Sequence, residues 1–305
     1  MPSFPECQAA AQFSAARDFR SRSLAFGKFV LFAALFFAFL QVLSIAMRPV
    51  RLSGIGWQAL AGNLSVAVAA LSATAVLSLF DARGFGAFGL GGSDKARNFL
   101  YGLGLGMVLL TALLALLRLV SGFRFGAVAT HGIAAVQFGA LYAALFLAVA
   151  LAEECLWRGY ALVKLSQGIS FWPAAMLLSL IFGADHWKHA GENTAGIVFA
   201  CLFGVVLAWS FRRTGSLWLA LGVHAGWNYC QSFVFGVPDS GVVLPGALLR
   251  AHLSGPAWLT GGRAGPEGSV LMVLVLPTLA LAILFIPVAA DRDRASPARA
   301  AGPTA

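Results

Sequence analysis

The stretch that decides the fold runs from Gln137 to Leu165 and reads QFGALYAALFLAVALAEECLWRGYALVKL. Its first half is almost wholly apolar, yet it leads into two adjacent carboxylates, Glu153 and Glu154, with Arg158 four residues after the second. At the centre of a membrane helix, each such charge costs roughly 2.5 to 3.5 kcal/mol. Three charges so close together need a function that compensates for this cost, and we infer that they take part in a chemical reaction.

The whole chain has the composition of a polytopic membrane protein. Of its 305 residues, 59% are hydrophobic and only 11% are charged, which is outside the range of ordinary soluble domains. A bilayer core about 30 Å thick needs about 20 helical residues per crossing. We therefore predict an all-α fold with about eight transmembrane helices, at residues 26–47, 58–80, 99–119, 133–157, 172–186, 195–211, 217–235 and 269–288.

The predicted helices form one domain with a tail at each end. We assign residues 1–25 to an N-terminal tail, 26–289 to an eight-helix intramembrane domain and 290–305 to a disordered C-terminal tail. Loops on the cytoplasmic side are enriched in Lys and Arg. With the N-terminus inside, 14 of the 21 basic residues fall on the inner side, so both tails are predicted to be cytoplasmic.

The net charge of +9 has a membrane explanation, because basic residues anchor helix ends against anionic lipid. No soluble segment interleaves aromatic and basic residues, so the bilayer is an expected partner and nucleic acid is not. Arg outnumbers Lys 17 to 4, a bias typical of GC-rich bacteria. We therefore expect an integral protein of the bacterial inner membrane.

Most of the 12 acidic residues fall in predicted tails, loops or helix ends, whereas Glu153 and Glu154 lie well inside a helix. Adjacent helical residues point about 100° apart, so the two carboxylates cannot share one task. Glu154 and Arg158, at i and i+4, lie on one face and can pair. Glu153 has no partner on its own helix, which makes it a candidate general base.

Two of the five histidines lie within or at the ends of later apolar segments. His186 follows Phe182 by four residues, and His224 precedes Asn228 by four, so each pair shares a helix face. One intramembrane histidine is readily explained as a packing residue. Two histidines together with two intramembrane glutamates indicate instead that polar side chains converge on one cavity.

These residues carry a resemblance to a known family. Residues 153–158 (EECLWR) fit the motif EExxxR, residues 182–186 (FGADH) fit FxxxH, and residues 224–228 (HAGWN) fit HxxxN. In this order the three motifs are similar to those of the CAAX protease and bacteriocin-processing family of intramembrane endopeptidases. The resemblance covers a motif core of about residues 150–230.

The resemblance implies an endopeptidase whose cavity opens to the cytoplasm. Glu153 would activate a water molecule that His186 helps to hold, and His224 and Asn228 would donate hydrogen bonds to the oxyanion of the tetrahedral intermediate. Glu154 and Arg158 would pair to orient the helix, and Phe182 would pack beside the site. No cofactor is expected.

Other functions stay open at this stage. Two histidines and a glutamate are also a common zinc set, so Glu153, His186 and His224 could bind zinc in a metal-dependent version of the same protease, although no HExxH is present. A non-catalytic protein of bacteriocin immunity or secretion-complex assembly is a further alternative, as is a transporter with a proton relay.

The expected substrate is a membrane-associated peptide or protein, with or without an attached lipid. We assign no chemistry to the long outer loop at residues 236–266.

Overall fold

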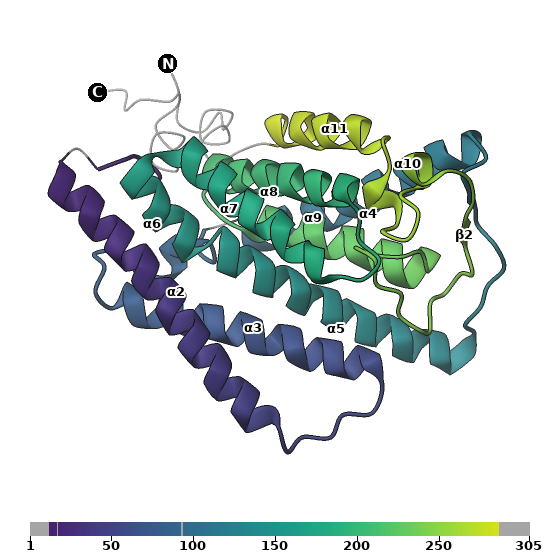
Figure 1. The fold of residues 1–305 in the computed structure, drawn as a ribbon, viewed down its shortest axis with the longest axis horizontal. Helices are drawn as coiled ribbons and strands as arrows, with labels where there is room; N and C mark the ends of the chain where they lie inside the picture. The colour runs from purple at the N-terminus through teal and green to yellow at the C-terminus, as the bar shows by residue number, and fades with distance from the viewer. Residues whose placement is uncertain (1–11, 17, 93, 287–305) are drawn as a thin grey trace, which may run out of the picture.

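The computed structural model describes residues 12–16, 18–92 and 94–286. These residues form a bundle of α-helices with a single two-stranded sheet (Figure 1). The helices are α2 (Phe19–Met47), α3 (Ile55–Ser78), α4 (Lys95–Leu119), α5 (Gly132–Trp157), α6 (Tyr160–Ile169), α7 (Phe171–Asp185), α8 (Thr194–Thr214), α9 (Trp218–Tyr229), α10 (Ala257–Thr260) and α11 (Met272–Leu284). Short 3-10 turns at Phe85–Phe88, His186–Lys188 and Pro266–Gly268, a π-helical turn at Cys230–Phe235, and strands β1 (Phe123–Arg124) and β2 (His252–Leu253) complete the fold.

The predicted all-α membrane fold is confirmed at the level of class. Among the described residues, five helical segments are long and apolar enough to cross a bilayer: Phe19–Met47, Ile55–Ser78, Lys95–Leu119, Gly132–Ile169 and Thr194–Thr214. The other three predicted crossings coincide with α7, α9 and α11, which have 15, 12 and 13 residues. At 1.5 Å per residue, these helices are shorter than a bilayer core of about 30 Å. The protein is therefore an integral membrane protein, and the count of eight spans stays a prediction.

The first helix begins earlier than the predicted first span. An N-cap at Asp18, whose carboxylate accepts a hydrogen bond from the Ser21 amide at 2.9 Å, starts α2 at Phe19. Just before it, Phe13 is buried and packs edge-on against Phe171 and Phe211. The remainder of the predicted N-terminal tail, residues 1–11 and 17, and the predicted C-terminal tail at 290–305 lie outside the described residues.

Helices α4 and α9 form the closest helix pair in the bundle. Their contact is made by glycines, as the GxxxG spacing of Gly102 and Gly106 predicts. A Cβ atom on Gly106 would lie 2.8 Å from the amide nitrogen of Trp227, and one on Gly102 would lie 2.8 Å from that of Val223. Only glycine permits this approach, which fixes the position of α9 and of the side chains it carries.

A buried ionic cluster joins α2, α6 and the residues after α3. The Asp81 carboxylate accepts hydrogen bonds from Lys28 at 2.9 Å, Lys164 at 2.7 Å and the Tyr160 hydroxyl at 2.8 Å. Burial opposes ionisation of Asp81, but these three donors outweigh it and hold the pKa of the carboxyl below its usual range.

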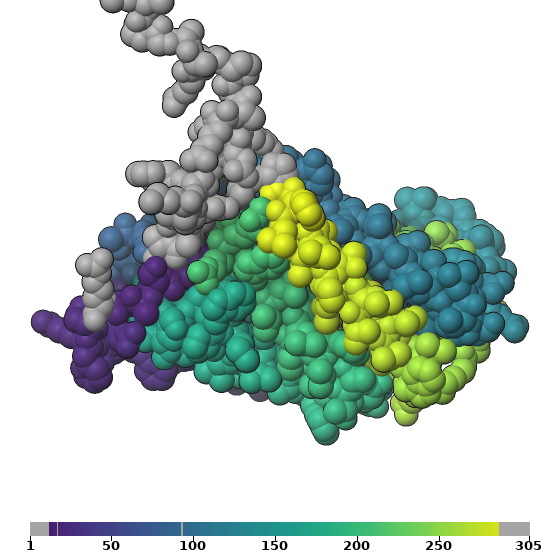
Figure 2. All heavy atoms as spheres, turned by 90° about the horizontal axis from the view of Figure 1, so that it is seen from above, coloured from purple at the N-terminus to yellow at the C-terminus, as the bar shows by residue number. Residues whose placement is uncertain are grey.

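The segment between the π-helical turn and α11 folds back over one end of the bundle. Its strand β2 pairs antiparallel with β1, with Phe123 opposite Leu253. In Figure 1, β2 and α10 lie at the right-hand end, where α5 begins, whereas α2 begins at the left-hand end. Helix α11 then runs along the outside of the bundle against α8 and α4, as the space-filling view in Figure 2 shows.

Candidate active site

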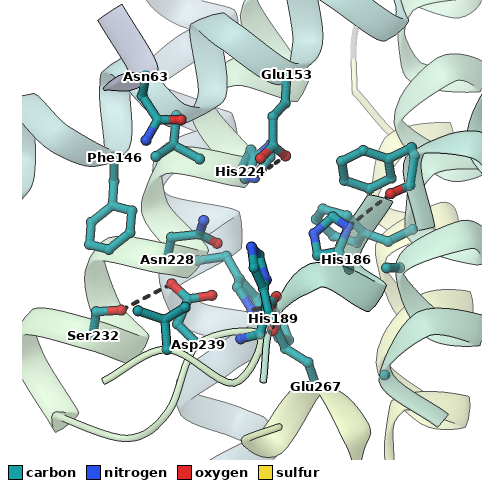
Figure 3. A pocket seen from close by; sticks show the side chains of 18 of the residues that line it. Asn63, Phe146, Glu153, His186, His189, His224, Asn228, Ser232, Asp239 and Glu267 are labelled. Atoms are coloured by element: carbon teal, nitrogen blue, oxygen red, sulfur yellow. Dashed lines mark hydrogen bonds and ion pairs between the residues drawn. The ribbon is translucent and has the colours of Figure 1, made fainter. Parts of the chain in front are cut away.

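A cavity of about 240 Å³ lies inside the bundle. Side chains from α3, α5, α7, α8 and α9 line it, together with residues of the segment between the π-helical turn and α11. Glu153, His186, His224 and Asn228, the four predicted catalytic residues, all lie on its wall (Figure 3). Polar side chains that are far apart in the sequence therefore converge on one cavity within a largely apolar bundle.

Glu154 and Arg158 lie behind the cavity wall and form the predicted ion pair. Glu154 is fully buried, Arg158 is 2% exposed, and Arg158 donates to Glu154 Oε1 at 3.1 Å. The same oxygen is 2.9 Å from Nδ1 of His224. Glu154 therefore joins the end of α5 to α9, and a carboxylate so deeply buried is stabilised only by partners of this kind.

Phe182 fills the space between this ion pair and His186. The Arg158 guanidinium carbon lies 4.1 Å from the centre of the Phe182 ring, within cation–π distance. The Phe182 ring also contacts the His186 ring edge-on, with 4.7 Å between the two ring centres. Phe182 also lines the cavity.

His186 is held by the backbone of its own helix. Its Nδ1 lies 2.8 Å from the carbonyl oxygen of Phe182, which can only accept a hydrogen bond. Nδ1 therefore carries the hydrogen, and Nε2 is left with a free lone pair. A ring fixed in this tautomer can accept a hydrogen bond from a water molecule in the cavity.

Glu153 lines the cavity, whereas Glu154 is fully buried behind the cavity wall. The Glu153 side chain is 27% exposed, and its Oε2 lies 3.6 Å from Nε2 of His224, too far for a direct hydrogen bond. His224 thus has one glutamate beside each ring nitrogen, Glu154 at Nδ1 and Glu153 at Nε2. Sequence spacing showed that Glu153 has no partner on α5, but it could not show that the neighbour comes from α9.

Asn228 lies one helical turn after His224 and is 8% exposed. It lines the cavity, and within the described residues its side-chain amide makes no hydrogen bond with another protein group. The amide therefore offers donors and an acceptor to whatever occupies the cavity.

The polar residues that line the cavity and that sequence reasoning did not select include Asn63, His189, Asp239 and Glu267 (Figure 3). Asn63 comes from α3, where it reads as an isolated polar residue in an apolar helix. The other three follow helix ends, in stretches that read as solvent-exposed loops. Sequence carries no local signal that these loops fold inward.

The alternative zinc site does not form as a cluster. Among residues 12–16, 18–92 and 94–286, no three His, Cys, Asp or Glu side chains are grouped closely enough to hold a metal ion. Glu153, His186 and His224 share the cavity wall without converging on one point.

Comparisons with known proteins identify the region that carries the site. Residues 135–230 match the family model described as type II CAAX prenyl endopeptidase Rce1-like. Neither the curated proteins nor the solved structures contain a match to this chain. The matched segment includes all seven predicted site residues, so the resemblance seen in the motifs is confirmed: residues 135–230 are similar to the Rce1-like type II CAAX prenyl endopeptidases.

Proposed function

We propose that this protein is an intramembrane endopeptidase that hydrolyses a peptide bond near the membrane-anchored end of a peptide or protein, using a water molecule activated by Glu153. The observation that carries the proposal is the convergence of Glu153, His186, His224 and Asn228 on one cavity within an Rce1-like domain. Family membership supports endopeptidase activity in general, and the mechanism rests on the geometry of these four side chains.

In the proposed first step, a water molecule binds between the Glu153 carboxylate and Nε2 of His186. Glu153 removes a proton from this water as its oxygen attacks the carbonyl carbon of the scissile peptide bond. The carbonyl oxygen becomes an oxyanion, and the side-chain amide of Asn228 donates a hydrogen bond to it.

His224 contributes the second donor when Nε2 carries a hydrogen, because its Nδ1 is already engaged with Glu154. Removing one oxyanion donor from a comparable site costs about 2.7 to 4 kcal/mol of transition-state stabilisation. Glu153 then returns its proton to the leaving amine as the C–N bond breaks. This leaves a carboxylic acid on one fragment and an amine on the other.

The proposed substrate is a membrane-associated peptide or protein, with or without an attached lipid. We also propose eight crossings in a bacterial inner membrane with both termini in the cytoplasm, which the distribution of Lys and Arg supports. Under this topology the residues on either side of α10, which help to line the cavity, face outward. We propose no nucleic-acid partner.

The test is cleavage of a library of membrane-anchored peptides by the purified protein in lipid nanodiscs, read by mass spectrometry. Wild type and Glu153→Ala are compared with and without a metal chelator. We expect cleavage by wild type in both conditions and none by the variant. Chelator-sensitive cleavage would favour the zinc version, and absence of cleavage by both proteins would favour a non-catalytic role in immunity or secretion-complex assembly.

A further inference from the structure

Two carboxylates, Asp239 and Glu267, line the cavity at the end opposite Glu153 (Figure 3). Both belong to the stretch between the π-helical turn and α11. With Glu153 they make three carboxylates on the wall of a cavity of about 240 Å³. Within the described residues, no Lys or Arg side chain lines this cavity, so its three acidic groups have no basic side chain beside them on the wall.

Glu267 is held rigidly by neutral donors. Its Oε1 accepts from the indole nitrogen of Trp227 at 2.9 Å, and its Oε2 accepts from both the amide and the hydroxyl of Ser240, each at 2.9 Å. Three hydrogen bonds orient the carboxylate without neutralising it. Trp227 lies next to Asn228 in the sequence, so this acid is fixed directly to the helix that carries two of the candidate catalytic residues.

Asp239 is held in the same manner but with fewer donors. Its Oδ2 accepts from the Ser232 hydroxyl at 3.0 Å, and the neighbouring backbone is fixed by Gln231, which donates to the Pro238 carbonyl at 2.6 Å. Burial, reinforced by the negative charge of Glu267, raises the pKa of Asp239 well above its usual value. A positive group near the two acids would favour the ionised form of Asp239 and so offset both its burial and its repulsion by Glu267.

Asn228 supplies an independent indication that a ligand occupies this region. Its side chain is more than nine-tenths buried, points into the cavity between His224 and Asp239 in Figure 3, and has no protein partner in the described part of the chain. A side-chain amide that faces the cavity without a protein partner can donate hydrogen bonds to a bound molecule and accept one from it. The cavity is thus built to receive polar groups from a bound molecule at this depth.

We propose that Asp239 and Glu267 form a subsite for a cationic group of the peptide substrate, a lysine or arginine side chain, and that they thereby select substrates with a basic residue near the scissile bond. The cation would be paired on both sides by fixed carboxylates. Its aliphatic stem would lie against the apolar wall, which includes Phe146, Phe199 and Phe203. This inference rests on the proposed endopeptidase function.

The test compares two membrane-anchored peptides that differ at one position near the cleavage site, lysine in one and methionine in the other. We expect wild type to show a kcat/KM at least about tenfold higher for the lysine peptide, equivalent to about 1.4 kcal/mol. In Asp239→Asn, Glu267→Gln and the double variant, this ratio should fall toward one. Moving the lysine through successive positions of the peptide locates the subsite relative to the scissile bond.

Glu192→Gln is the matched control, because Glu192 is near enough to Glu267 to interact with it electrostatically but does not line the cavity. It should keep the wild-type preference for lysine. A ratio near one in wild type, or a preference that survives in the Asp239/Glu267 double variant, would overturn the proposal.

A binding measurement separates this inference from the proposed function. Fluorescence anisotropy of the two labelled peptides with Glu153→Gln reports the subsite without requiring turnover. Stronger binding of the lysine peptide, lost in Asp239→Asn/Glu267→Gln, would support the subsite even if no peptide were cleaved. Equal binding of both peptides would overturn the subsite even if cleavage occurred.

Discussion

Replacing Arg158 with Met tests whether the ion pair behind the cavity holds the site together. Arg158 is 2% exposed, donates to Glu154 at 3.1 Å and lies over the ring of Phe182. Its loss leaves a fully buried carboxylate with His224 as its remaining hydrogen-bond partner. Removing one member of a buried pair costs about 3 to 5 kcal/mol, which corresponds to a fall in Tm of roughly 6 to 20 °C for a domain of this size.

Thermal unfolding in detergent, followed by size-exclusion chromatography after heating, measures this effect. The matched control is the double variant Glu154→Gln/Arg158→Met, which removes both charges while a glutamine oxygen can still accept from His224. We expect the double variant to be clearly more stable than Arg158→Met alone, because no unpaired charge stays buried. A shift below about 1 kcal/mol in the single variant, or a double variant whose loss equals the sum of the singles, would refute the reasoning.

Three other predictions follow from the fold. Gly106→Leu should force α4 away from α9 and reduce both Tm and activity. Gly104→Leu, where a Cβ meets no atom within 4 Å, should leave the free energy of unfolding within about 1 kcal/mol of wild type. Equal effects of the two substitutions would contradict the glycine contact. Asp81→Asn should destabilise by about 2 to 3 kcal/mol at neutral pH, since Lys164 loses its partner. Because the folded pKa of Asp81 is depressed, the stability that Asp81 contributes is present above its unfolded pKa and is lost as the pH falls through the folded pKa. If wild type stayed more stable than Asp81→Asn below the folded pKa, that result would contradict this prediction. With the native cysteines replaced, Val243→Cys should react with an impermeant maleimide added outside intact cells and Lys95→Cys should not, and the reverse pattern would invert the proposed topology.

The parts of the site that sequence predicts are those that depend on local geometry. The pairing of Glu154 with Arg158 and the contact of His186 with Phe182 follow from i,i+4 spacing on one helix, whatever the rest of the chain does. The contacts of His224 with Glu154 and Glu153 join residues 70 and 71 positions apart. No periodicity encodes it, although the scarcity of polar residues in apolar helices indicates that they meet.

Sequence reasoning failed for the acids at the other end of the cavity. Asp239 and Glu267 stand among glycines and prolines in a segment that resembles an exposed loop. Their inward orientation depends on hydrogen bonds from Ser232, Ser240 and Trp227, which form only after the segment folds over the bundle. Composition identifies such a segment as a connection between helices but does not reveal which side of it is buried.

The prediction of helix boundaries from the sequence was limited by a similar problem. Hydropathy locates the apolar stretches well, but it cannot distinguish a full crossing from a short buried helix. Helix α9 shows this, because its apolar run continues into a π-helical turn at Cys230–Phe235. The predicted span at 217–235 is therefore two kinds of helix in the structure.

The central claim is that Glu153 is the general base, and the single-turnover cleavage rate of Glu153→Gln tests it most directly. Glu153 is part-exposed, and its Oε2 makes no hydrogen bond within the described structure, so the variant should keep the wild-type Tm. Loss of a general base lowers rates about 10² to 10⁴-fold, and we predict a fall of at least about 100-fold on the same membrane-anchored peptide. A rate within tenfold of wild type, measured on equally folded protein, would contradict the account.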